Sequence, residues 1–248
     1  MKKIIAGNWK MNGSAESLTK MLDALRAADT AHATVIVCPP FPYLGRAAGA
    51  PVAIGAQDVS THDSGTYTGE VSAAMLHDVG AKYVIVGHSD RRQNHHETNE
   101  IVAAKAASAL KNELIPIICI NETREDRLGG HAKAVVEKMV RESIPDAAAA
   151  PNRGHAILAY EPIWAISTGV VEKTDNVRAT TDDIREMHAH IAGILESMGL
   201  GGMTILYGGS AKAANAAEIL AVPHVGGVLV GGASLKPEDF VPIIAAAK

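Results

Sequence analysis

The sequence predicts a single α/β domain over residues 1–248, folded as a closed (β/α)8 barrel. Eight short apolar runs follow one another with helical stretches between them. The runs are nearly continuous rather than alternating, which is typical of parallel strands covered on both faces. A length of 248 residues is typical of one such barrel. A doubly wound open sheet is the alternative, but no G-x-G-x-x-G sequence follows the first run.

The apolar runs that we expect to form strands are short and aliphatic. The first ends at Gly7-Asn8, and the second ends at Pro39-Pro40, which cannot continue a sheet because proline lacks a backbone N–H. The expected strands are residues 4–6, 34–38, 52–56, 83–86, 115–120, 156–159, 203–206 and 228–230.

Helical spacing of apolar residues fills the segments between these runs. Ser14 is a candidate N-cap for a helix that extends to about Ala28. Pro237 suits the first turn of the last helix, and the acidic pair Glu238-Asp239 suits the positive end of its dipole. The other expected helices are residues 95–111, 131–143 and 181–198.

Composition excludes several classes of protein. The hydrophobic share is 47% and the aromatic share only 4%, so we expect a large aliphatic core. A net charge of −4 argues against nucleic acid or an anionic membrane as the main partner. Cys38 and Cys119, the only cysteines, form no disulfide framework and belong to no Cys/His set with zinc spacing.

The start of the chain and its hydropathy bear on location. Met1-Lys2-Lys3 leads directly into an apolar strand and lacks the features of a signal peptide. No apolar run reaches membrane-spanning length. These features predict a soluble protein of a reducing compartment, the cytoplasm.

Chemically useful residues follow the ends of several expected strands. In a barrel, the carboxyl ends of the strands line the active site. An amine, an imidazole, a carboxylate and two small-residue turns that can hold phosphate together indicate proton transfer on a small phosphorylated carbonyl compound. The residues are Asn8 and Lys10 after the first strand, His88 after the fourth, Glu161 after the sixth, Ser210 after the seventh, and Gly231 and Gly232 after the eighth.

Five segments resemble signature segments of the triosephosphate isomerase family, in that family's order and approximate spacing. The resemblance runs from end to end. It implies a TIM barrel that interconverts dihydroxyacetone phosphate and D-glyceraldehyde 3-phosphate, in glycolysis and gluconeogenesis, without a metal or an organic cofactor. The segments are residues 7–12 (GNWKMN), 87–92 (GHSDRR), 160–165 (YEPIWA), 207–210 (YGGS) and 229–234 (LVGGAS).

The resemblance also implies a role for each candidate residue. Glu161 resembles the base that moves a proton between two carbons, and His88 resembles the neutral electrophile that supports the enediolate. The family is itself a standard example of an imidazole kept neutral by a helix N-terminus. Lys10 resembles the cation that attracts phosphate and stabilises the transition state, and Asn8 a supporting donor. The residues expected to bind phosphate through backbone N–H groups are Ser167, Ser210, Gly231 and Gly232.

Three departures from the family pattern concern the site and its lid. Asp90 stands where the family usually has glutamate, so we expect its contact with Lys10 to need a water or a backbone shift. Ser167 stands where the lid usually has glycine. The stretch over residues 170–180 is longer than the usual hinge of the lid.

Some neighbouring residues have structural rather than chemical expectations. Cys119 matches a family cysteine and is expected to pack, while Glu122 is expected to accept hydrogen bonds behind the site. His95-His96 are not expected to bind metal, because adjacent helical residues do not face one another.

The sequence also bears on the oligomeric state and leaves three alternative functions open. Residues 66–70 resemble the tip of the loop that the family inserts into a partner subunit, which implies a homodimer. One alternative is an isomerase of a slightly longer sugar phosphate. Another is a non-catalytic barrel that binds phosphate ligands or proteins. The third is a lyase or synthase that uses Lys10 as a Schiff base.

Overall fold

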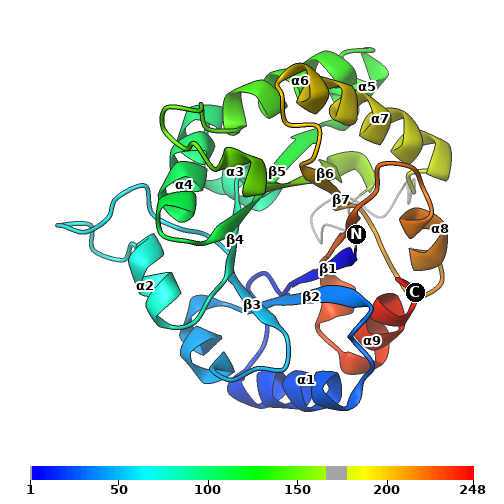
Figure 1. Cartoon of the computed structure of the whole chain (residues 1–248). Coiled ribbons are helices and arrows are strands. Elements are labelled where there is room, and N and C mark those ends of the chain that lie inside the picture. Colours follow the sequence, from blue (N-terminus) through cyan, green and yellow to red (C-terminus); the bar gives the residue numbers. More distant parts are fainter. Residues whose placement is uncertain (1, 166–177) are drawn as a thin grey trace.

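The computed structural model describes residues 2–165 and 178–248, and its strands form a closed, all-parallel barrel. They follow one another around the ring in chain order, and β1 pairs with β8 to close it (Figure 1). The predicted fold class is therefore confirmed. The strands are β1 (Lys3–Asn8), β2 (Ala33–Cys38), β3 (Ala53–Ala56), β4 (Tyr83–Val86), β5 (Ile115–Glu122), β6 (Ile157–Pro162), β7 (Thr204–Tyr207) and β8 (Gly227–Val230).

Helices surround the barrel on its outer side (Figure 1). The α-helices are α1 (Ala15–Ala27), α2 (Ala73–Asp78), α3 (Ser89–His95), α4 (Asn99–Lys111), α5 (Arg124–Leu128), α6 (Ala132–Ser143), α7 (Thr181–Ser197), α8 (Ala216–Leu220) and α9 (Pro237–Ala245). Short 3-10 helices are η1 (Phe41–Ala47), η2 (Arg153–His155), η3 (Ile163–Ala165) and η4 (Gly232–Ser234). Among the helices of the described residues, none has the length and apolar composition needed to cross a membrane.

The predicted start of α1 is confirmed in detail. The Ser14 hydroxyl accepts the N–H of Ser17 at 3.1 Å, and the Ser17 hydroxyl accepts the N–H of Ser14 at 2.8 Å. This reciprocal pair satisfies two N–H groups that the first turn of a helix leaves without partners.

The prediction of one helix over residues 95–111 is wrong at its start. His95 ends α3, and His96 then takes a left-handed conformation with φ of 55°. Thr98 caps the next helix by accepting the N–H of Ile101. The structure therefore has two helices, α3 and α4, with a break between them, where the periodicity predicted one helix beginning at residue 95.

The core has two layers separated by the sheet. The interior of the barrel holds aliphatic and cysteine side chains contributed by the strands, including Ala6, Ile85 and Cys119. The second and larger layer lies between the strands and the helices, and it includes Ile5, Val35 and Leu18. Strand residues alternate between the two layers, because successive side chains point to opposite faces.

Candidate active site

A cavity of about 680 Å³ opens at the carboxyl ends of the strands. It brings together residues from opposite ends of the sequence. Of the predicted site residues, Ser167 lies outside the described residues, as do residues 166–177 of the expected lid. All the others line this cavity: Asn8, Lys10, His88, Glu161, Ser210, Gly231 and Gly232.

Lys10 is held through both its main chain and its side chain. Its φ of 53° is left-handed, a conformation that a non-glycine residue keeps only with support. The Asn8 side-chain oxygen accepts the Lys10 N–H at 3.0 Å, and Gln57 Nε2 donates to the Lys10 carbonyl at 2.9 Å. The Lys10 ammonium lies 3.2 Å from Asp90 Oδ2. The two charges therefore meet directly, without the bridging water that was one of the two expected arrangements; the other, a backbone shift, stays a prediction.

His88 is the N-cap of α3, and its ring is oriented on both sides. Nδ1 accepts the backbone N–H of Asp90 at 3.0 Å, so a neutral ring carries its proton on Nε2. Nε2 lies 2.9 Å from Glu161 Oε1. Burial disfavours the imidazolium, but Glu161 and then Asp90 outweigh it, so the pKa of His88 is raised in this arrangement. The hydrogen bond from the Asp90 N–H favours the neutral ring of His88, because the Nδ1 atom of an imidazolium has no lone pair to accept it.

Glu161 lies near the end of β6 and is only 1% exposed. Besides the contact with His88, its Oε2 accepts the backbone N–H of Ser89 at 3.0 Å. A β-carbon at Gly208 would lie 2.8 Å from Glu161 Cγ, so glycine at this position gives the side chain its room. Both carboxylate oxygens of Glu161 are therefore engaged, one by His88 and the other by Ser89.

The loops after β7 and β8 form the opposite side of the cavity. A β-carbon at Gly209 would overlap the Tyr207 hydroxyl at 2.1 Å, so this turn requires glycine. The Ser210 N–H donates to the Ala165 carbonyl at 3.3 Å, which is long for a hydrogen bond of this kind. Gly231 faces Lys10, since a β-carbon there would lie 4.0 Å from Lys10 Cε.

A cation, an imidazole, a carboxylate and two glycine-rich turns thus share one cavity. Comparisons with known proteins identify the family to which the chain belongs. The family model described as triosephosphate isomerase matches residues 3–247. The chain belongs to the triosephosphate isomerase family.

Individual relatives agree over the whole length. The chain is 46% identical to the triosephosphate isomerase of Acidiphilium cryptum, with 100% of this chain and 99% of that one covered. It is 44% identical to that of Cupriavidus taiwanensis, with 98% of each covered. The crystal structure of triosephosphate isomerase from Bartonella henselae superposes with a TM-score of 0.86 at 38% identity, covering 99% of both chains.

Sequence reasoning did not assign a role to several residues that line the cavity of this family member. Asn12 lies within the first signature segment, and Lys212 lies two residues beyond the segment that ends at Ser210. Proximity to these motifs was the available signal. Leu235 directly follows the segment that ends at Ser234, so it carried the same signal. Asp239 carried none, because it reaches the cavity only through the return of α9 to the barrel.

The structural expectations for neighbouring residues agree with their surroundings. Glu122 accepts hydrogen bonds from the Tyr160 hydroxyl at 2.7 Å and from Trp164 Nε1 at 2.8 Å. Cys119 is fully buried, and burial together with the nearby Glu161 raises the pKa of its thiol well above the ordinary value. Such a thiol is not a nucleophile at neutral pH. The described residues contain no group of His, Cys, Asp or Glu side chains that could hold a metal ion.

Proposed function

We propose that this member of the triosephosphate isomerase family interconverts dihydroxyacetone phosphate and D-glyceraldehyde 3-phosphate, with Glu161 as the base and His88 as the electrophile. The observation that carries the proposal is the contact of 2.9 Å between His88 Nε2 and Glu161 Oε1 in a cavity that also contains Lys10. A proton acceptor and a proton donor adjacent to a cation suit a substrate that bears both a carbonyl group and a phosphate.

The reaction begins when the substrate displaces Glu161 from His88. The carboxylate takes a proton from C1 of dihydroxyacetone phosphate, and the C–H electrons form the C1–C2 double bond while negative charge collects on the C2 oxygen. His88 Nε2–H donates to that oxygen and transfers a proton between the two oxygens. Glu161 then returns its proton to C2, which leaves an aldehyde at C1.

The remaining residues bind the substrate. Asn8 uses its side-chain oxygen to hold Lys10, so its amide nitrogen is the part that serves as a donor to the substrate. The ammonium of Lys10 attracts the phosphodianion and stabilises the enediolate. Backbone N–H groups of Ser210, Gly231 and Gly232 hold the phosphate, together with Ser167 from the lid. This mechanism requires no metal or organic cofactor.

The site also favours isomerisation over a non-catalytic barrel and over a Schiff-base lyase or synthase. A barrel that only bound phosphate ligands would gain nothing from a buried carboxylate in contact with an imidazole. Schiff-base chemistry needs a free amine, whereas the Lys10 ammonium is paired with Asp90.

The test is the Glu161→Asp variant in a coupled assay with glyceraldehyde 3-phosphate. Shortening the side chain retracts the carboxylate, and a misplacement of about 1 Å costs on the order of a hundredfold in turnover. Glu218→Asp is the matched control, because Glu218 is exposed on α8 and should tolerate the same change without loss. Wild-type turnover by a folded Glu161→Asp variant would remove Glu161 from the reaction.

We further propose a cytoplasmic, single-domain protein that acts as a homodimer in glycolysis and gluconeogenesis. Met11, next to Lys10, is 96% exposed. The connection between β3 and α2 projects from the barrel (Figure 1), and on it Tyr67 stacks on His62 with ring centroids 3.8 Å apart. A projecting loop and a bare apolar side chain suit mutual insertion across a two-fold axis.

Sedimentation tests the homodimer. Tyr67→Glu should shift the protein to monomer mass and lower its specific activity, whereas Leu128→Glu, at another exposed apolar side chain, should change neither. A wild-type protein that sediments as a fully active monomer would contradict the proposal.

A further inference from the structure

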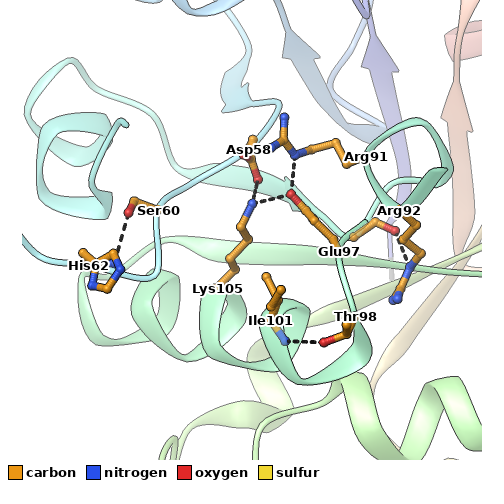
Figure 2. Close-up of polar contacts among 10 residues, drawn as sticks. Asp58, Ser60, His62, Arg91, Arg92, Glu97, Thr98, Ile101 and Lys105 are labelled. Atoms are coloured by element: carbon orange, nitrogen blue, oxygen red, sulfur yellow. Dashed lines mark hydrogen bonds and ion pairs between the residues drawn. The ribbon is translucent and has the colours of Figure 1, made fainter. Parts of the chain in front are cut away.

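Four charged side chains meet beside the active site, where α3, α4 and the segment after β3 come together (Figure 2). Lys105 Nζ lies 2.6 Å from Asp58 Oδ1 and 2.5 Å from Glu97 Oε1. Arg91 joins the same two carboxylates, with Nε 2.5 Å from Glu97 Oε1 and a terminal nitrogen 2.9 Å from Asp58 Oδ2. We call Asp58, Arg91, Glu97 and Lys105 the charge cluster.

The charge cluster is largely shielded from water. The side chains of Lys105 and Glu97 are 7% and 4% exposed, and that of Asp58 is 14% exposed. Buried ion pairs of this kind are often no more stabilising than apolar side chains of the same volume, because each charge loses its hydration. What the cluster provides is a fixed geometry, since every member has two oppositely charged partners.

Two members of the cluster are adjacent in sequence to residues that hold Lys10. Asp58 follows Gln57, whose side chain donates to the Lys10 carbonyl at 2.9 Å. Arg91 follows Asp90, whose carboxylate lies 3.2 Å from the Lys10 ammonium. The Gln57 contact with the Lys10 carbonyl and the Asp90 contact with the Lys10 ammonium therefore both come from residues adjacent in sequence to members of the cluster.

We propose that the charge cluster positions Lys10. Asp58 holds its neighbour Gln57 in place, and Arg91 holds its neighbour Asp90. The ion pairs with Glu97 and Lys105 in turn hold Asp58 and Arg91. The cluster touches no substrate, so its members are positioning residues rather than catalytic ones. Lys10 needs this support because its left-handed backbone is intrinsically unfavourable and its side chain has one ionic partner among the described residues.

The inference rests on the proposed function, since Lys10 is taken there to attract the phosphate. The test compares Arg91→Met in two backgrounds, wild type and Lys10→Met. Two readouts are used: kcat/KM for glyceraldehyde 3-phosphate and the Kd for glycerol 3-phosphate, which has the phosphate but no carbonyl. In the wild-type background we expect a loss of about tenfold in both, within the range of coupled neighbouring residues.

In the Lys10→Met background, the same Arg91→Met change should cause no further loss, because the residue that it positions is gone. Equal losses in both backgrounds would overturn the proposal and leave the cluster a purely structural feature. Equal losses accompanied by a fall in sedimenting mass would also overturn it, in favour of a role in subunit association.

Two further variants keep the test decisive. Arg91→Lys retains the charge but lacks the planar fork that reaches both carboxylates, so it should fold and show a smaller loss with the same dependence on Lys10. Arg141→Met, at an exposed arginine paired with Glu137 on α6, is the matched control and should change neither readout. Binding of glycerol 3-phosphate separates the two proposals, because its dependence on Lys10 and Arg91 can be measured even in a protein that does not isomerise.

Discussion

His188 should make the protein sensitive to mildly acidic pH. It lies in α7, is fully buried, and packs edge-on against Tyr160 with ring centroids 5.9 Å apart. Its Nδ1 lies 3.3 Å from the His224 carbonyl, to which a neutral ring donates. Its Nε2 is buried and has no hydrogen-bond partner among the described residues. Protonation would place an unpaired charge in the apolar layer between helices and sheet.

The size and sign of the effect follow from the pKa. Burial lowers the pKa of His188 from an ordinary value of 6.5 to about 4. Above pH 6.5 the ring is neutral in the folded and the unfolded states, so it has no influence. As the pH falls below 6.5, the unfolded chain binds a proton that the folded protein rejects until about pH 4. At 1.36 kcal/mol per pH unit, this lowers the free energy of unfolding by about 3 kcal/mol across that window.

Urea unfolding at pH values between 7.5 and 4 measures the effect. His188→Gln cannot titrate and keeps an amide donor for the His224 carbonyl, so its stability relative to wild type should rise by about 3 kcal/mol as the pH falls. The difference between the two proteins removes the contribution of carboxylates, which they share. His190→Gln, on the same helix but less buried, should show the wild-type slope. Parallel curves for wild type and His188→Gln would refute the reasoning.

Three further predictions concern the barrel and its helices. Gly227→Ala should abolish soluble folded protein, because its β-carbon would lie 1.9 Å from a carbonyl oxygen of β1, whereas Gly202→Ala, in open space, should express normally and give the wild-type circular dichroism spectrum. Cys38 and Cys119 should not react with a thiol reagent until the protein unfolds, because burial raises the pKa of Cys38 to about 12 and that of Cys119 well above its usual range. Ser14→Ala should lower the free energy of unfolding in urea by about 1 kcal/mol, since it removes the N-cap of α1.

The strands could be predicted from the sequence because a strand that is buried on both faces has a continuous apolar run. Their ends could not, because pairing with neighbours decides where a strand stops. Asn121 in β5 pairs with Glu161 in β6, and both strands extend past their apolar runs. Glu161 is therefore a strand residue and not, as expected, the start of a loop. The left-handed turn at His96 was also missed, since residues 91–100 contain no apolar side chain whose spacing could mark a break between two helices.

The candidate site could be predicted as a set of residues but not as an arrangement. His88 and Glu161 were found from their positions at strand ends, yet their contact depends on the register of the strands. The sequence also gave no indication that Gln57 supports Lys10, or that Gly208 makes room for Glu161. These relations join residues far apart in the chain, and short motifs carry no information about them.

The closure of the ring by β1 and β8 also has a consequence for folding during synthesis on the ribosome. At about 5 to 20 residues per second, the roughly 220 residues between these two strands take about 10 to 45 seconds to translate. During that time β1 can pair with β2 but not with β8. Its other edge therefore exposes unpaired backbone groups that can pair with strands of other chains. Delays in translating the last quarter of the message should therefore raise the demand for chaperones more than equal delays near its beginning.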